Sequence, residues 1–177
     1  GECLMNRTLP LMIEHLKQAN VAENIAIVTN GLLLTPEISL ALVKAGVDHI
    51  RISLQGMSGW KYKEICGKKI KFGDFVDNIT FLYDHKKNCQ ISVKIADVAL
   101  DLGDENLFYT IFKYNSDRMY IEHIRPMFKE NEQDGKVRSK FGKEHKPVVV
   151  CPQPFYFMAV TATGGVIPCC SYYDPIG

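Results

Sequence analysis

Three cysteines near the carboxyl end of the chain have the spacing of a metal site. Cys151 is followed by an aromatic run, then by Gly164 and Gly165, and then by the pair Cys169 and Cys170. Glycine readily adopts the positive φ angles of tight turns, so this segment is expected to form a hairpin that brings Cys151 and Cys169 together. Two such thiolates suit zinc or an iron–sulfur cluster. Cys170, or residues beyond the carboxyl end, would complete the ligand set.

The elements that position the remaining polar residues are short strands alternating with helices. Helices are predicted at 10–19, at 36–46 after the N-cap residue Thr35, and at 58–66, 72–86 and 104–114; strands are predicted at 25–28, 48–54, 90–98 and 119–124. A fifth strand is counted if the residues just before Glu2 belong to one. This alternation predicts parallel β–α units with right-handed crossovers. An open sheet and part of a (β/α) barrel both fit it.

Polar residues follow the predicted strands where each one ends. They are Glu2, Thr29, Asn30, Ser53, Gln55, Lys94, Asp97 and Arg125. Active sites of parallel α/β proteins gather at the carboxyl ends of the strands. One such residue alone would be assigned to a cap or a turn, but the whole set favours a shared ligand site. No glycine-rich motif for a nucleotide phosphate is present, and the five histidines show no metal-ligand spacing.

Composition narrows the class of protein. The 177 residues carry a formal net charge of +1, which does not suggest nucleic acid or another polyanion as a partner. No apolar run is long enough to span a membrane, and no leader-like segment is visible. The six cysteines are therefore expected to be reduced thiols in the cytoplasm rather than disulfides.

Four segments resemble, in order and spacing, the motifs of one enzyme family. Residues 1–6 are similar to the end of a GGEP strand, with Cys3 where proline is usual. Residues 27–31 are similar to TTNG, and residues 45–56 to AGxDxIxISLDG, with Gln55 where an acid is common. Cys151, Gly164 and Cys169 match the C-x(9–15)-G-x4-C opening of an auxiliary cluster domain. Together they resemble radical S-adenosylmethionine (SAM) enzymes of the SPASM/twitch group.

The resemblance implies a role for each matching residue. Glu2 would bind the methionyl ammonium group of SAM, Asn30 would lie beside the cofactor, Ser53 and Gln55 would bind ribose hydroxyls, Lys94 would bind the methionyl carboxylate, and Arg125 and Met127 would pass along the adenine. Cys151 and Cys169 would ligate an auxiliary iron–sulfur cluster, with Cys170 as a third ligand or only a neighbour.

The resemblance also implies the architecture. Residues 1–128 would form part of a (β/α)6 barrel of the TIM type, corresponding to strands 2–6 of the radical SAM core. Residues 129–147 would be a linker, and residues 148–177 would begin the auxiliary domain. The family's CxxxCxxC loop, which holds a [4Fe–4S] cluster, is absent from this sequence. The chain is expected to begin just after that loop and to be inactive alone, with Cys66 and Cys89 as small apolar fillers.

An intact enzyme of this kind would cleave SAM to a 5′-deoxyadenosyl radical that abstracts a substrate hydrogen. Its cofactors would be SAM, the [4Fe–4S] cluster and the auxiliary cluster. Its partners would be a small-molecule or peptide substrate and an electron donor such as a flavodoxin or a ferredoxin. The alternative is a non-catalytic α/β binding module with a structural zinc hairpin.

Overall fold

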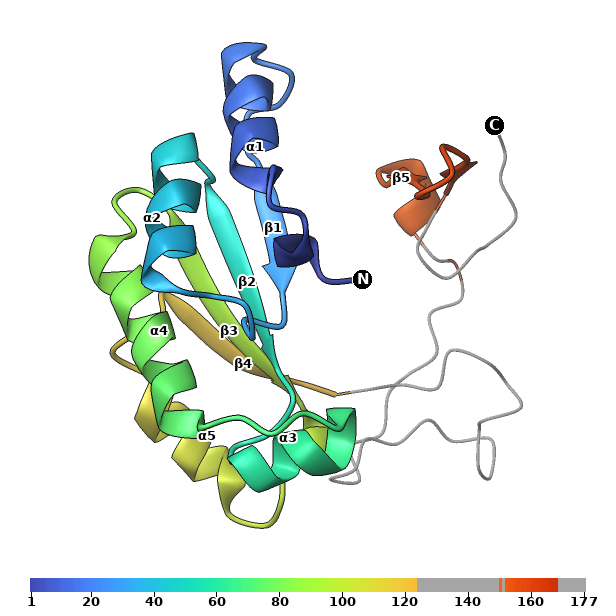
Figure 1. The fold of residues 1–177 in the computed structure, drawn as a ribbon. Coiled ribbons are helices and arrows are strands. Elements are labelled where there is room, and N and C mark those ends of the chain that lie inside the picture. Colours follow the sequence, from blue (N-terminus) through green and yellow to red (C-terminus); the bar gives the residue numbers. More distant parts are fainter. Residues whose placement is uncertain (124–149, 151, 169–177) are drawn as a thin grey trace. The chain divides into compact units, whose positions relative to one another are not determined.

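The structure is a computed structural model that describes residues 1–123, 150 and 152–168. The chain divides into two compact units, Gly1–Ile124 and Arg125–Gly177 (Figure 1). The predicted linker, residues 129–147, lies outside the described residues. No helix within the described ranges is long and apolar enough to cross a membrane.

The first unit contains a four-stranded parallel sheet in the order β1-β2-β3-β4. Its strands are β1 (Ala26–Thr29), β2 (His49–Leu54), β3 (Gln90–Ala96) and β4 (Arg118–Glu122). Its α-helices are α1 (Leu9–Gln18), α2 (Pro36–Ala45), α3 (Gly59–Cys66), α4 (Phe72–His85) and α5 (Asp104–Phe112). Two 3-10 turns are η1 (Cys3–Met5) and η2 (Asp97–Ala99).

The predicted helices and strands between residues 10 and 124 are confirmed, with ends that differ by no more than two residues. Local signals explain this agreement. The Thr35 hydroxyl accepts a hydrogen bond from the Ile38 N–H at 3.3 Å, and Gly46 ends α2 with a φ of 86°. Ser58 caps α3 in the same way. The possible fifth strand is not found among the described residues, because Gly1 and Glu2 lie in no strand.

The two faces of the sheet differ in character. Along β2, Ile50, Ile52 and Leu54 are buried against the helices, whereas Arg51 is exposed and Ser53 is half-buried. The core between sheet and helices also includes Leu42 of α2. Helices α1, α2, α4 and α5 lie on this one side of the sheet (Figure 1). A doubly wound sheet has helices on both faces. The sequential strand order and the helices on one side are consistent with part of a (β/α) barrel.

An aspartate that binds both a lysine and a backbone N–H occurs twice near the amino ends of the strands, and each such group is called a clamp below. Lys17, in the last turn of α1, donates to Asp48 at 2.5 Å, and the same carboxylate accepts the Ile25 N–H at 2.6 Å. The second clamp repeats this arrangement at β3 and β4. There Lys86 donates to Asp117 at 2.6 and 2.8 Å, and Asp117 accepts the Ile91 N–H at 2.7 Å. In both clamps lysine and aspartate are 31 residues apart.

The described part of the second unit contains an antiparallel pair, β5 (Ala159–Val160) and β6 (Val166–Ile167), after the 3-10 turn η4 (Gln153–Phe155). Gly164 adopts a φ of 89° in the connecting turn, where its N–H donates to the Thr161 carbonyl at 3.0 Å. A hairpin is therefore present between the predicted cysteine ligands. Cys151, Cys169 and Cys170 themselves lie outside the described residues.

The two cysteines predicted as apolar fillers differ. Cys89 is buried at 3 % exposure, as predicted. The prediction for Cys66 is wrong, because this residue is exposed. It occupies the last position of α3, where its thiol donates to the Tyr62 carbonyl at 3.0 Å instead of filling the core.

Position 31 requires glycine, both because of its backbone angle and because of its close neighbours. Its φ is 74°, and a Cβ there would lie 3.0 Å from Phe75 Cε2 and 3.1 Å from Ile52 Cγ2. Gly67 has a similar φ of 68° with no atom within 4 Å of such a Cβ, so it is a matched control. We expect Gly67→Ala to lower the free energy of unfolding by about 1 kcal/mol and Gly31→Ala by about 2 to 4 kcal/mol. Urea unfolding measures both, and equal losses would contradict the packing argument.

The clamp at Asp48 predicts a pH-dependent stability. The pKa of this carboxyl lies below its ordinary value because Lys17 and the Ile25 N–H donate to it. A lowered folded-state pKa stabilises the protein above the unfolded-state pKa of about 4, and this contribution disappears as the pH falls through the folded-state value. Asp48→Asn should therefore lower the free energy of unfolding at pH 7 by about 1 kcal/mol.

At pH values well below 4 the difference between Asp48→Asn and the wild type should close, because the wild-type carboxyl is then protonated. The matched control is Asp77→Asn, on the exposed side of α4, which should leave the free energy of unfolding at pH 7 nearly unchanged. Denaturant unfolding at several pH values tests this. A deficit of Asp48→Asn that stays constant with pH would show that the charge does not stabilise the fold.

Candidate functional site

Glu2 is held against the carboxyl end of β1 by a network of hydrogen bonds. Its Oε1 accepts from the Thr29 hydroxyl at 2.6 Å and from the Leu4 N–H at 3.0 Å. Its Oε2 accepts from the Asn30 N–H at 2.7 Å. The network joins the turn η1 to the strand end, although residues 2 and 29 are far apart in sequence. Two of the polar residues singled out from the sequence, Glu2 and Asn30, are thus in contact.

The network keeps Glu2 ionised. Burial alone would raise the pKa of this carboxyl, but the hydrogen bonds from Asn30, Thr29 and Leu4 outweigh it and hold the pKa below its ordinary value. Within the described residues, Oε2 accepts only the Asn30 N–H. A carboxylate oxygen has room for further donors. Glu2 can therefore bind a ligand ammonium group by a charge-assisted hydrogen bond.

Cys3, which stands where the resembled motif has proline, is a neutral thiol. Burial and the neighbouring charge of Glu2 raise its pKa to about 11. Its Sγ donates to the Val28 carbonyl at 3.2 Å. The thiolate is the form that binds metals and attacks electrophiles, so this environment disfavours both roles.

Asn30 and Gly31 shape the turn after β1. The Asn30 side-chain oxygen accepts the Leu32 N–H at 2.9 Å, and the Thr29 hydroxyl accepts the Gly31 N–H at 3.0 Å. The Asn30 amide nitrogen makes no hydrogen bond to the residues that the structure describes, so it can donate to a ligand. This position is compatible with the predicted place beside a cofactor.

Ser53 and Lys94 lie side by side on the face of the sheet opposite helices α1, α2, α4 and α5. They are direct partners in the β2–β3 register, and Lys94 is in turn opposite Tyr120 of β4. Lys94 Nζ donates to Glu122 Oε2 at 2.7 Å. The predicted carboxylate-binding lysine is thus already engaged by an acid on the same face. The Ser53 hydroxyl makes no hydrogen bond to the described part of the protein.

A pocket of about 410 Å³ opens beside Glu2 and Asn30. The other residues that line it are Met5, Leu32, Leu33, Lys68, Lys69 and Ile70. It therefore combines one carboxylate, two ammonium groups and apolar side chains. The predictions from sequence missed Lys68 and Lys69. They could have been noticed as two adjacent lysines directly after Gly67, in the connection between α3 and α4.

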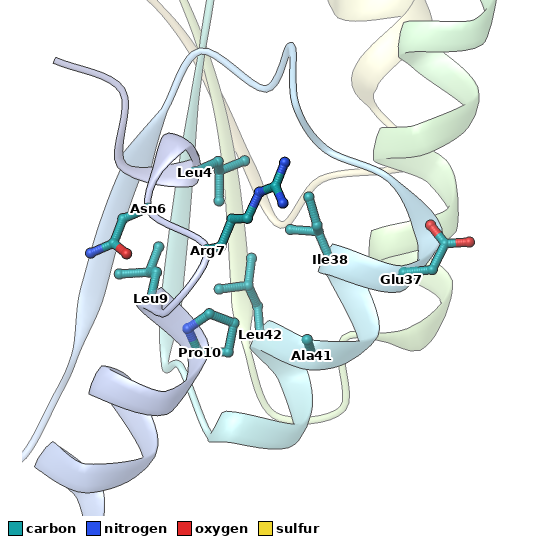
Figure 2. Close-up of a pocket in the computed structure, with 9 residues that line it drawn as sticks. All are labelled: Leu4, Asn6, Arg7, Leu9, Pro10, Glu37, Ile38, Ala41 and Leu42. Carbon is teal, nitrogen blue, oxygen red and sulfur yellow. The ribbon is translucent and has the colours of Figure 1, made fainter.

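A second pocket, of about 370 Å³, is shown in Figure 2 and contains none of the predicted site residues. It is lined by residues of η1, α1, α2 and the turn between η1 and α1: Leu4, Asn6, Arg7, Leu9, Pro10, Glu37, Ile38, Ala41 and Leu42. Most of these side chains are apolar. This pocket lies within the helix layer rather than on the polar face of the sheet.

A buried carboxylate and a histidine meet beyond the ends of β3 and β4. Asp97 is fully buried, and its Oδ2 lies 3.1 Å from His123 Nδ1. The sequence placed Asp97 among the polar strand ends but gave His123 no partner. Only the parallel pairing of β3 with β4 brings the two together.

Within the described ranges, no three histidine, cysteine or acidic side chains gather into a metal-binding group. Cys3, Cys66 and Cys89 are free cysteines. The predicted cluster ligands and the two predicted adenine contacts, Arg125 and Met127, lie outside the described residues. Their roles remain predictions.

Comparison with known proteins identifies the class of protein to which this chain belongs. Residues 1–106 match the family model of the Radical SAM superfamily, so the chain is a member of that superfamily. Membership implies SAM and a [4Fe–4S] cluster as cofactors. The carboxylate of Glu2 and the polar strand ends fit SAM. The thiolates that a cluster needs are not supplied by the residues that the structure describes, so these residues do not fit the cluster itself.

Curated relatives of the chain include GTP 3′,8-cyclases. The chain is similar to a probable GTP 3′,8-cyclase of Methanococcus vannielii, with 37 % identity over 76 residues, which is 41 % of this chain and 25 % of that protein. It is also similar to the GTP 3′,8-cyclase of Staphylococcus aureus, with 32 % identity over 95 residues, 54 % of this chain and 28 % of that protein. The chain thus spans about a quarter of the length of these curated relatives.

The Thr29 hydroxyl predicts a measurable effect on Glu2. Thr29→Val keeps the buried shape but removes the 2.6 Å hydrogen bond to Oε1, so the pKa of Glu2 should rise. A titration of the Glu2 carboxyl carbon by NMR measures the change. The control is Asn30→Ala, which keeps the backbone N–H that donates to Oε2 and should leave the pKa of Glu2 nearly unchanged. An unmoved pKa in Thr29→Val would contradict the assigned network.

Proposed function

We propose that this chain forms the SAM-binding part of a radical SAM enzyme. The observation that supports the proposal best is the ionised Glu2 carboxylate, which is fixed at the end of β1 by Thr29 and Asn30 and lines a pocket. A fixed anion with a remaining acceptor site suits the ammonium group of the SAM methionyl moiety. Membership in the Radical SAM superfamily indicates that the ligand with this ammonium group is SAM.

SAM, when bound and reduced by one electron, supplies a 5′-deoxyadenosyl radical that takes a hydrogen atom from the substrate. The residues of this chain bind and orient it. Glu2 accepts from the ammonium group, and Asn30 lies beside the cofactor. Ser53 and Gln55 donate to or accept from the ribose hydroxyls. The residues Arg125 and Met127 complete the predicted contacts with the adenine.

The position of the helices on one side of the sheet supports a partial barrel as the surrounding architecture. In a (β/α) barrel the helices lie outside and the other face of the sheet lines the interior. The face that carries Arg51, Ser53 and Lys94 would then line the reaction chamber. We propose that β1 to β4 correspond to consecutive strands of the radical SAM core.

The second unit is proposed to begin an auxiliary iron–sulfur domain of the SPASM/twitch kind. Support comes from the β5–β6 hairpin and the turn at Gly164, which lie between Cys151 and Cys169 in sequence. Cys151, Cys169 and Cys170 are the proposed ligands. An electron donor such as a flavodoxin or a ferredoxin, and a cytoplasmic location, complete the proposal.

The substrate is proposed only as a small molecule or a peptide. The GTP 3′,8-cyclases act on GTP by name, but their similarity to this chain covers about a quarter of their length. That similarity is too short to extend their substrate to this chain.

The proposal is tested by the formation of 5′-deoxyadenosine from SAM. The full-length protein would be reconstituted with iron and sulfide in the absence of air, reduced, and assayed by chromatography. We expect wild-type protein to form 5′-deoxyadenosine and Glu2→Gln to form at least about tenfold less, since the charged contact is lost. The control is Glu14→Gln, on the exposed side of α1, which should keep wild-type activity.

A cluster-loaded wild-type protein that does not cleave SAM would refute the proposal. Metal analysis of the same preparation separates the two hypotheses for the second unit. Iron and sulfide beyond one [4Fe–4S] cluster would support the auxiliary domain, whereas bound zinc would support a structural zinc hairpin.

A further inference from the structure

We propose that Lys68 and Lys69 bind the carboxylate of the SAM methionyl group in the pocket beside Glu2. This inference rests on the proposed function and assigns a role that the sequence predictions gave to Lys94. Three observations support it. They are the charged residues that line the pocket, the anchoring of the loop that bears the two lysines, and the ion pair that Lys94 forms with Glu122.

The loop that carries the lysines is anchored on both sides. Gly67 ends α3 with a φ of 68°, and its N–H donates to the Lys63 carbonyl at 3.1 Å. Ile70 packs against the hydrophobic core. A Cβ added at Gly59 would lie 2.4 Å from the Ile70 carbonyl oxygen, so this loop passes directly over the start of α3. Lys68 and Lys69 are therefore presented at the pocket by a short, fixed connection.

The charges of the pocket match an amino-acid head group. Glu2 is ionised and faces the same pocket as the two exposed lysines. Neither lysine forms an ion pair or hydrogen bond with the described part of the protein. A zwitterion with one ammonium and one carboxylate group would satisfy both signs of charge. Leu32 and Leu33 offer apolar surface for the chain between that head group and the sulfonium.

Lys94 is less available for the same task. Its ammonium group is engaged by Glu122 at 2.7 Å, so binding a ligand carboxylate would require it to share or give up that partner. Lys94 also lies in the row of Ser53 and Tyr120, on the face of the sheet opposite the helices, and does not line the pocket of Glu2. The lysines of the α3–α4 loop face no such competition from the described residues.

The test compares two ligands that differ only in the carboxylate. SAM and decarboxylated SAM would be titrated calorimetrically into the full-length, cluster-loaded protein without reductant, so that binding is measured in the absence of turnover. The variants are Lys68→Met/Lys69→Met, the charge-preserving Lys68→Arg/Lys69→Arg, and Lys94→Met. The control is Lys63→Met, an exposed lysine of α3 that does not line the pocket.

We expect the wild type to bind SAM at least about tenfold more tightly than decarboxylated SAM. Lys68→Met/Lys69→Met should weaken SAM binding by about tenfold and leave binding of decarboxylated SAM unchanged. The arginine variant should restore most of the SAM affinity, and Lys63→Met should behave as the wild type. This pattern distinguishes a direct contact with the carboxylate from a change in folding or in the overall electrostatic potential of the protein.

Two results would overturn the inference and leave the proposed function intact. One is an equal loss of affinity for both ligands in Lys68→Met/Lys69→Met. The other is a carboxylate-specific loss in Lys94→Met alone, which would support the role first predicted for Lys94. A wild-type protein that binds neither ligand would instead refute the proposed function, and the inference with it.

Discussion

Each strand of the parallel sheet must present apolar side chains to the helices on one face and polar side chains on the other. The rest of the first unit depends on this constraint. Ile50, Ile52 and Leu54 bury one face of β2 beneath the helices, while Arg51 and Ser53 occupy the other. Because side chains alternate along a strand, a shift of one residue would exchange the two faces. The apolar core therefore fixes which polar side chains reach the open face, and the site follows from the packing.

Much of the fold could be predicted because its signals are local. A cap such as Thr35 or a left-handed glycine such as Gly46 acts within a few residues, so the limits of α2 can be read from sequence. The alternation of β and α elements likewise predicts parallel pairing. Whether helices cover one face of the sheet or both could not be predicted, since that depends on how the connections between the strands pack. The sequence does not state that directly.

The site was predictable only in part, because many of its contacts join residues that are far apart in the sequence. Glu2 and Asn30 could be named from their motifs, and the hydrogen bond between them at 2.7 Å joins them in space. The contacts of Lys94 with Glu122 and of Asp97 with His123 depend on the register of β3 against β4. Lys68 and Lys69 belong to no motif, and their place beside Glu2 depends on how the α3–α4 connection passes over the start of α3. Cys66 resembled a core residue in type, yet it falls at an exposed helix end.

The two lysine–aspartate clamps have a consequence for how this protein can change. Both lie at the amino ends of the strands, whereas Glu2, Asn30 and the lysines of the pocket lie at the opposite edge. The clamps that hold the strands together and the pocket beside Glu2 thus lie at opposite ends of the strands. Mutations in the loops around the pocket can alter what is bound without weakening the clamps, so new specificities can arise there at little cost to folding.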